Sequence, residues 1–373
     1  MSRERAMPLL DLHAHFPMHL DFPPRVTQGP PPVDKQAEFW AANMLLNFQG
    51  GKPRVSLDEL LAGASGGIGS VLYDPDDEFF RDAKPVPHAF KDLLAQMNQA
   101  EDAVKGKLKI ATNPADVSKY LSSGEKFLFQ CVEGAFALGG DETNVDALAS
   151  KGVAYVIVAH LFYRGVVTCE NAIPFVPDQF FHSVLNPEQN SAVGLTDLGR
   201  KIVSRLLQKK ILVDITHCTQ LAQKEIFHLA RDHNNAPVIS SHTGVRGTSD
   251  YPLNLTPGAI RDIAKSKGVI GVILGSHWLR APSQQIAGPD GFELIFRAID
   301  HIHDVTESYD NIAIGSDLDG FIQPVKGCET YGKTPKLVDA IKRRYSQSRY
   351  PGVADKILYH NALDVLQRGW AGV

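Results

Sequence analysis

The chain has 373 residues, 43% of them hydrophobic, so it can bury a large core and exceeds the roughly 250 residues of a typical (β/α)8 barrel. Its formal net charge of -4, from 38 Lys and Arg against 42 Asp and Glu, excludes a strong whole-molecule field for nucleic acid or an anionic membrane. The four cysteines form no CxxC pair, and no secretory leader or span of about 20 apolar residues is present, so we expect a cytoplasmic protein without a disulfide framework.

Eight short apolar runs, each followed by polar or glycine residues, are typical of buried parallel strands. In chain order they are residues 8–15, 69–75, 127–135, 154–160, 211–217, 237–243, 268–274 and 312–320. Helical patterns lie between several of them, at residues 196–209, 219–232 and 256–267, each beginning at a Thr suited to cap a helix. The repeated strand–helix units predict an α/β fold, the (β/α)8 TIM barrel, as a single catalytic domain over residues 1–373. An open, doubly wound sheet is the rival topology, but it places ligands at one switch point rather than around a ring of strand ends.

Loop signals mark two insertions, near residues 16–65 and 161–195. The first contains the Pro-rich stretch 22–32, and both follow predicted strands, where they could cover the catalytic face. The Gly-rich run 63–69 invites comparison with a phosphate-binding loop. It has no following GK[ST] and precedes a strand, which favours a tight turn.

The first predicted strand ends in Asp11-Leu12-His13-Ala14-His15. Side chains two residues apart on a strand point to the same face, so His13 and His15 share one side. If that side is the barrel interior, two imidazoles meet at the carboxyl-terminal mouth, where they could hold a divalent cation of zinc type.

Similar residues recur at other predicted strand ends. Glu133 closes an apolar run, where an unpaired buried charge is strongly disfavoured unless a cation neutralises it. His217, His242 and Asp317 end three later strands. Each alone has a structural alternative, a hydrogen-bonded core histidine or, for Asp317, a helix cap. Five ligand-type residues at the same place in their βα units nevertheless predict a metal site, with Asp317 suited to proton transfer.

His160 ends the fourth predicted strand, and two interpretations have equal weight. Five ligands already suffice for two metals that share Glu133, so His160 could donate a hydrogen bond to a developing oxyanion. It could equally be a structural residue of the core.

With these residues in this order, the chain resembles the membrane (renal) dipeptidase family of zinc peptidases, within the amidohydrolase superfamily. The similarity runs from about Leu9 to Leu366. The matching segments are Asp11 with His13, Val132-Glu133-Gly134, Val213-Asp214-Ile215-Thr216-His217, Pro237-Val238-Ile239-Ser240-Ser241-His242, Asn254-Leu255-Thr256, Gly268-Val269-Ile270-Gly271-Val272, Ile314-Gly315-Ser316-Asp317-Leu318-Asp319-Gly320 and Asn361-Ala362-Leu363.

This resemblance implies a site with two zinc ions bridged by Glu133. His13 and the residue at position 15 would bind one ion, and His217 and His242 the other. Asp317 would hold the bridging water, and His160 would contact the tetrahedral intermediate. The family also implies a homodimer.

Two positions depart from the family pattern. His15 stands where the family usually has Asp, which removes a negative charge from the first metal site. Leu253 stands where the family usually has an Arg that binds the substrate carboxylate. Arg246, on the same predicted loop, is the candidate substitute.

Together these patterns predict a metal-dependent hydrolase that cleaves the amide bond of a dipeptide or N-acyl amino acid through a metal-bridging hydroxide. Asp317 would orient the nucleophile and pass its proton to the leaving amine, while His160 would stabilise the oxyanion. The small-molecule alternative is an amidohydrolase acting on an ester, lactone or cyclic amide. An alternative from another class is a catalytically inactive barrel that binds a metal or ligand. No nucleic-acid or membrane partner is expected.

Overall fold

The computed structural model describes residues 7–21, 52–75, 78, 85–173, 176–280, 291–345 and 351–373. Parallel strands are ordered β2-β1-β9-β8-β7-β6-β5-β4, and a pairing of β2 with β4 closes them into an eight-stranded barrel. The predicted (β/α)8 barrel is confirmed: seven of the predicted strands contain the observed one, and the predicted strand 69–75 overlaps β2, which begins three residues earlier. Their bounds are β1 Leu9–Ala14, β2 Gly66–Leu72, β4 Phe127–Glu133, β5 Tyr155–Ile157, β6 Leu212–Asp214, β7 Val238–Thr243, β8 Ile270–Val272 and β9 Ile312–Ile314.

A ninth strand, β3 (Lys109–Ala111), was not predicted. It pairs with Phe127–Phe129 at the start of β4, and β5 pairs with residues 131–133 at the end of the same strand. β3 therefore extends one edge of β4 without entering the closed ring. Its three residues are too few to give an alternating pattern, and Lys109 is exposed.

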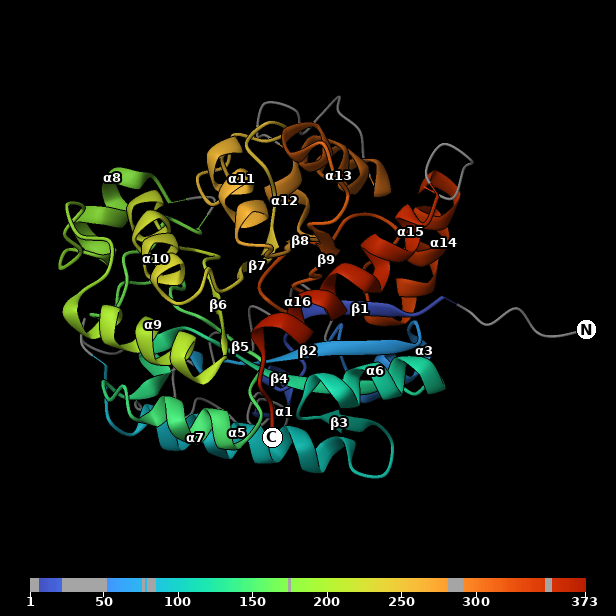
Figure 1. Cartoon of the computed structure of the whole chain (residues 1–373), viewed down its shortest axis with the longest axis horizontal. Helices are drawn as coiled ribbons and strands as arrows, with labels where there is room; N and C mark the ends of the chain where they lie inside the picture. Colours follow the sequence, from blue (N-terminus) through green and yellow to red (C-terminus); the bar gives the residue numbers. More distant parts are fainter. Residues whose placement is uncertain are drawn as a thin grey trace, which may run out of the picture.

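Helices surround the barrel on its outer face (Figure 1). The longer ones are α5 Ala89–Val104, α6 Pro114–Ser123, α7 Asn144–Ser150, α9 Asp197–Lys209, α10 Gln220–Asp232, α11 Pro257–Lys265, α13 Phe292–Thr306, α14 Thr334–Tyr345 and α16 Asn361–Gly369. The shorter ones include α1 Met18–Asp21, α3 Leu57–Ala62, α8 Asp178–Phe180, α12 Ser276–Leu279 and α15 Val353–Asp355.

The three predicted threonine caps are confirmed. The hydroxyls of Thr196, Thr219 and Thr256 accept backbone N–H groups in the first turns of α9, α10 and α11. Within the described residues, no helix combines the length and apolar character needed to cross a membrane.

Buried apolar side chains fill the interior of the barrel below its mouth. Leu10, Leu12, Phe129, Tyr155 and Ile239 belong to one buried cluster although they come from strands on different sides of the ring. A larger cluster, with Val132, Val156 and Val213, packs between the strands and the helices. The strands are therefore buried on both faces, as expected of a parallel barrel.

At the rim of the barrel, β1 and β7 each contain a bulge that changes which side chains face the interior. From Asp11 to Ala14, β1 advances three residues while β2 advances two, from Ile68 to Ser70. β7 does the same against β8, between Ser240 and Thr243. An extra residue shifts the alternation of side chains, so Leu12 lies in the interior cluster and His13, the next residue, also faces inward.

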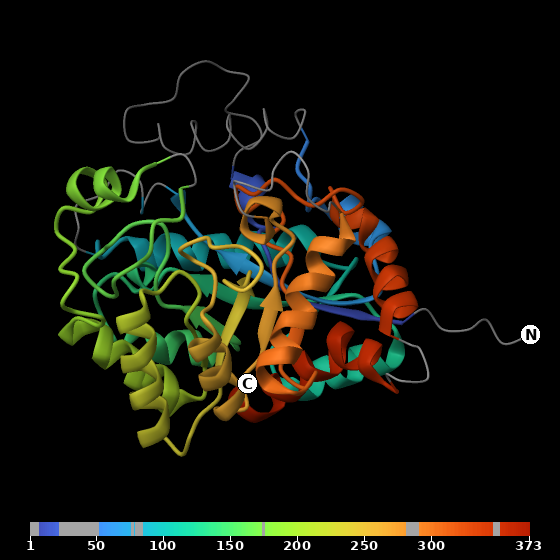
Figure 2. The same cartoon turned by 90° about the horizontal axis from the view of Figure 1, so that it is seen from above.

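The interpretation of residues 63–69 as a tight turn is wrong for residues 66–69, which belong to β2. A side chain on Gly69 would overlap the carbonyl of Leu12 on the neighbouring strand, so these glycines allow close strand contact rather than a turn. The Pro-rich stretch 22–32 lies outside the described residues. The described part of 161–195 has little regular structure apart from α8 and the turn that follows it. Figure 2 shows the barrel and its helices from a second direction.

Candidate metal centre and active site

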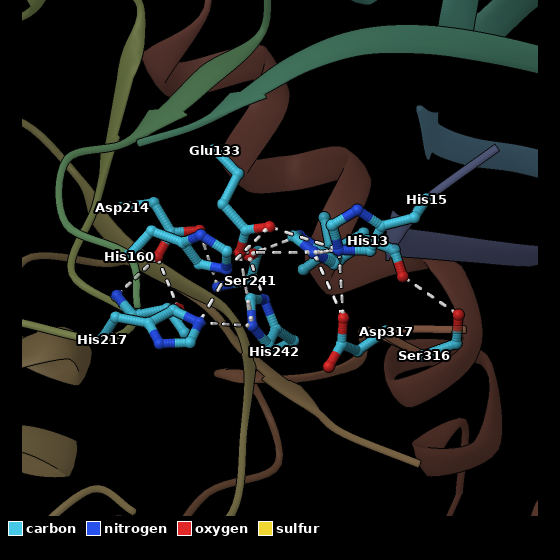
Figure 3. A network of polar contacts seen from close by, with 12 residues as sticks. His13, His15, Glu133, His160, Asp214, His217, Ser241, His242, Ser316 and Asp317 are labelled. Carbon is cyan, nitrogen blue, oxygen red and sulfur yellow. Dashed lines mark hydrogen bonds and ion pairs between the residues drawn. The ribbon is translucent and has the colours of Figure 1, made fainter. Parts of the chain in front are cut away.

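The structure brings together six of the predicted site residues at the carboxyl-terminal mouth of the barrel (Figure 3). They are His13 and Glu133 in the ends of β1 and β4, His242 in β7, and His15, His217 and Asp317 just beyond β1, β6 and β9. Each is at most 5% exposed. The strand ends therefore enclose a polar cluster that solvent hardly reaches.

The four histidines of this cluster form two close pairs. The Nε2 atoms of His13 and His15 are 3.2 Å apart, and those of His217 and His242 are also 3.2 Å apart. Two ligands of one tetrahedral zinc ion, each about 2.0 Å from the metal, would lie about 3.3 Å apart. Each pair thus has the spacing of two ligands on one cation.

Glu133 lies between the two pairs, as Figure 3 shows. Its Oε2 is 3.2 Å from His15 Nε2, and its Oε1 is 3.6 Å from His217 Nε2 and 3.7 Å from His242 Nε2. Two groups spaced to hold a metal ion share this carboxylate, one with His13 and His15 and one with His217 and His242. The Glu133 carboxylate therefore lies within 3.7 Å of a nitrogen of each histidine pair.

The hydrogen bonding of Glu133 also fits a metal centre. No described residue makes a well-aligned hydrogen bond to either carboxylate oxygen, and both oxygens are buried. A buried carboxylate without donors is costly, and a cation is the partner that would compensate it. The donor set of imidazole and carboxylate suits zinc and other transition metals.

The orientation of His13 is fixed from behind. Its Nδ1 lies 3.1 Å from the hydroxyl of Tyr155, which donates its own proton to the carbonyl of Leu12. The Tyr155 oxygen can therefore only accept from His13, which places a proton on Nδ1 and leaves the lone pair of Nε2 facing the cluster. Ser241 Oγ lies 3.2 Å from Nδ1 of both His13 and His242 and braces the two rings together.

Two further carboxylates, to which the sequence assigned no role, hold the backbone around the candidate ligands. Asp11 accepts from the backbone N–H groups of His13 and Ser316, at 3.1 and 2.8 Å. Asp214 accepts from those of Thr216 and Ser241, at 2.8 and 3.0 Å. Each carboxylate joins two neighbouring strand ends, so both set the positions from which the ligands project.

Strained backbone marks the same rim. His217 and Asp317 have φ values of 67° and 56°, which side chains other than glycine rarely adopt. A Cβ on Gly320 would overlap the Asp317 carboxylate and press on His15. Asp317 is also tied to β1, because its N–H donates to the carbonyl of His13 at 2.8 Å. Its Oδ1 consequently sits 3.3 Å from His15 Nε2.

The buried histidines differ in the direction of their pKa shifts. Burial holds the pKa values of His13 and His217 well below the ordinary histidine value, which favours the neutral form that binds metals. Burial also acts to lower the pKa of His15, but Glu133 and Asp317 outweigh it and raise the pKa to about 10. The carboxylates therefore make the side of the cluster near His15 favourable for positive charge.

His160 borders this cluster, and its partner is a residue that the sequence did not single out. Its Nε2 is 3.4 Å from Glu133 Oε2, and its Nδ1 is 2.7 Å from the carboxylate of Glu78, a fully buried residue. Glu78 was missed because it stands in the acidic run Asp74-Pro75-Asp76-Asp77-Glu78, which is typical of an exposed loop. Nothing in the sequence distinguishes this glutamate from the acidic residues next to it.

Arg246 is placed on the loop that follows β7, half-buried. Its guanidinium donates to the carbonyls of Pro252 and Asn254, at 2.7 and 3.2 Å, so two of its groups brace its own loop. Burial raises the pKa of Glu170, and the charge of Arg246 partly offsets that effect. Leu253, at the position of the family arginine, is buried.

An aromatic wall closes the side of His217 and His242. The Trp278 ring in α12 lies 5.7 Å from the His217 ring and 5.8 Å from the His242 ring. Tyr251 packs on Trp278, and its hydroxyl donates to the carbonyl of Ala172 at 2.7 Å. This contact joins the loop after β7 to the insertion after β5 at the rim of the site.

Comparison with known families agrees with this geometry. Residues 4–369 match the family described as membrane dipeptidase, peptidase family M19. A protein of Klebsiella pneumoniae encoded in the pqqA 5' region is 26% identical over 282 residues, which cover 74% of this chain and 94% of that protein. The dipeptidase tcpJ of Claviceps purpurea is 24% identical over 322 residues, covering 84% of this chain and 68% of the relative.

The fold is also found in solved structures. A metallopeptidase from Rhodobacter sphaeroides, crystallised with a phosphinate mimic of the dipeptide L-Ala-D-Ala, superposes with a TM-score of 0.74 at 21% identity. The match covers 98% of this chain and 100% of that one. At this identity the likeness concerns the fold.

Proposed function

Because the chain belongs to the membrane dipeptidase family of metallopeptidases, peptidase family M19, we propose that it hydrolyses the amide bond of a dipeptide or N-acyl amino acid with two zinc ions. The catalytic unit is a single domain over residues 1–373. The observation that carries this proposal is the buried Glu133 carboxylate, which lies between two histidine pairs with no well-aligned donor among the described residues. The bound mimic in the Rhodobacter sphaeroides structure supports a dipeptide as the substrate class.

In this proposal His13, His15 and Glu133 would hold one ion, and Glu133, His217 and His242 would hold the other. Divalent ions at these positions would supply a nucleophilic water at neutral pH and polarise the scissile carbonyl. The chain's own residues would then orient the substrate and the water and transfer the proton.

Asp317 is the proton-transfer residue. Its carboxylate, 4% exposed and fixed by the strand-end backbone, accepts the proton of the attacking water and delivers it to the leaving amine. His160 donates from Nε2 to the carbonyl oxygen as negative charge develops there. Trp278 and the loop after β7 keep bulk water from the side of His217 and His242.

The test is hydrolysis of a panel that contains L,L- and L,D-dipeptides, N-acyl amino acids, lactones and cyclic amides, with metal content measured on the same preparation. We expect two zinc ions per chain and turnover of dipeptides. Asp317→Asn should keep the metal content and lower kcat by orders of magnitude. Turnover confined to lactones or cyclic amides would remove the peptidase assignment, and an Asp317→Asn enzyme with an unchanged rate would remove its catalytic role.

For Arg246 we propose binding of the substrate carboxylate. Arg246→Ala should raise KM for a free dipeptide but leave KM for the corresponding dipeptide amide unchanged, because only the free acid presents a carboxylate. Equal effects on both substrates would assign Arg246 to bracing its loop alone.

A further inference from the structure

The buried carboxylate of Glu78, which follows β2 in the chain, contacts the segment after β5. Its Oε1 accepts from the backbone N–H of Phe162 at 2.9 Å, and its Oε2 accepts from the hydroxyl of Tyr73 at 2.8 Å. Arg164 donates to the backbone carbonyl of Glu78, at 2.8 Å from its Nε. The side chain is 0% exposed, so Glu78 is held from several directions and out of contact with solvent.

The contact between Glu78 and His160 fixes one proton of the imidazole. Both oxygens of Glu78 act as acceptors, Oε1 from the Phe162 N–H and Oε2 from the Tyr73 hydroxyl, so at 2.7 Å the His160 Nδ1 is the donor. This bond sets the rotation of the ring, and the Tyr73 ring packs against its edge at 4.5 Å between centroids. The opposite nitrogen, Nε2, then faces Glu133 at 3.4 Å.

We propose that Glu78 is the positioning residue of His160. The Glu78 carboxylate holds the proton on His160 Nδ1 and so directs Nε2 toward the carbonyl oxygen of the substrate. The inference rests on the proposed function, because His160 must act on that oxygen for its aim to matter. The arrangement follows the logic of a carboxylate–histidine pair, in which the acid holds one ring proton and fixes the ring orientation. Because Nδ1 keeps its proton in the bond to Glu78, Nε2 can donate to the substrate oxygen only when the ring carries both protons, and the Glu78 carboxylate stabilises that cation. Glu78 itself lies behind the imidazole and reaches no reacting atom.

A purely structural role for Glu78 makes a different prediction. If the carboxylate only joined the two loops through Tyr73 and Phe162, its loss would change stability and leave His160 unaffected. Glu78→Gln has the same shape and keeps an oxygen acceptor, but it removes the charge. This substitution therefore tests the bond to His160 with the least disturbance of the loops.

The kinetic test is a double-mutant cycle on the zinc-loaded enzyme. Partner residues of this kind are worth about 10- to 100-fold in activity, so Glu78→Gln should lower kcat by that amount with KM within about threefold. In a His160→Ala background the same substitution should change kcat by less than about twofold, because its effect passes through the missing ring. The matched control is Glu59→Gln, which removes the charge from a carboxylate of α3 that accepts the Gly332 N–H at 2.8 Å, a contact that involves none of the proposed site residues. Full activity of Glu78→Gln, or equal losses in both backgrounds, would overturn the proposal.

A spectroscopic measurement on the same zinc-loaded chain separates this inference from the proposed function. Imidazole ¹⁵N–¹H correlations should show a protonated, hydrogen-bonded His160 Nδ1 in the parent, assigned by its loss in His160→Ala. The signal should shift strongly in Glu78→Gln and stay in place in Glu59→Gln. If no dipeptide is hydrolysed, the proposed function fails while this signal still decides whether Glu78 positions the ring. If dipeptides are hydrolysed but the His160 Nδ1–H signal does not shift in Glu78→Gln, only the positioning role of Glu78 is contradicted.

Discussion

The two ends of the barrel are built from opposite kinds of residue. At the amino-terminal end, Phe127 begins β4 within an apolar cluster that includes Leu212 and Trp370. The last turn of α16 closes this end, since a side chain on Gly369 would strike Leu212 and Pro237. At the carboxyl-terminal end, the same strands finish in histidines, carboxylates and strained backbone.

The residues that stabilise the fold therefore lie mainly at one end of the barrel, and the residues proposed to bind metal and substrate lie at the other. Apolar packing at the closed end contributes stability in proportion to the area it buries. The open end concentrates buried charge and left-handed residues, which cost free energy unless a ligand compensates them. Substitutions at the open end should therefore act mainly on metal binding and turnover, and those at the closed end mainly on unfolding.

The largest effect should come from Glu133→Gln at the open end. The amide keeps the shape but removes the charge shared by both proposed metals, so we expect activity to fall at least ~10³-fold and metal content to drop. Zinc at a thousandfold excess over its Kd should stabilise the parent by about 4 kcal/mol, and the variant by much less. Metal analysis and unfolding with and without zinc measure both.

Glu293→Gln is the control for that experiment, since Glu293 is an exposed residue of α13. It should retain the metal content and the zinc-dependent stabilisation of the parent. Undiminished zinc stabilisation in Glu133→Gln would break the assignment of the open end as a metal centre.

Phe127→Ala should give the largest effect at the closed end. Phe127 is fully buried, and large-to-small changes of this kind cost about 3–5 kcal/mol. Because the cavity lies at the far end of β4 from Glu133, kcat per folded molecule should stay within about twofold. Urea unfolding and active-site titration separate the two quantities. Leu61→Ala, at a side chain 44% exposed, should cost less than about 0.5 kcal/mol.

The sequence carried different amounts of information about these two ends. Hydrophobic periodicity and the Thr caps predicted the strands and helices, and the recurrence of ligand-type residues at strand ends predicted the residues that the structure brings together at the barrel mouth. The bulges in β1 and β7 could not be predicted, because an inserted residue changes pairing without changing composition. Glu78 could not be predicted either, since its burial depends on contacts with Tyr73 and His160 that only the closed barrel creates.

Gly320→Ala should have an intermediate effect, at the open end and without removal of any ligand. The added methyl group would displace the Asp317 carboxylate, and misplacement of a catalytic group by about 1 Å costs about 100-fold in rate. We expect kcat to fall by that factor with two zinc ions retained, as measured by steady-state kinetics and metal analysis. In Gly258→Ala, where the nearest atom is 3.7 Å away, both values should match the parent. An active Gly320→Ala enzyme would show that the position of Asp317 tolerates displacement.

The smallest effect tests the scaffold between the two ends. The Thr196 hydroxyl accepts the Gly199 N–H at 3.0 Å to cap α9, and it lies within 2.9 Å of the carbonyl of Gly165 in the insertion after β5. Thr196→Ala should lower the free energy of unfolding by about 1 kcal/mol, and Thr196→Ser should restore most of it because the hydroxyl returns. Denaturant unfolding measures the loss, and kcat should be the same in all three proteins. If kcat falls with Thr196→Ala and recovers with Thr196→Ser, the helix cap holds the insertion over the site, and the separation between folding and catalytic residues is narrower than the two ends of the barrel indicate.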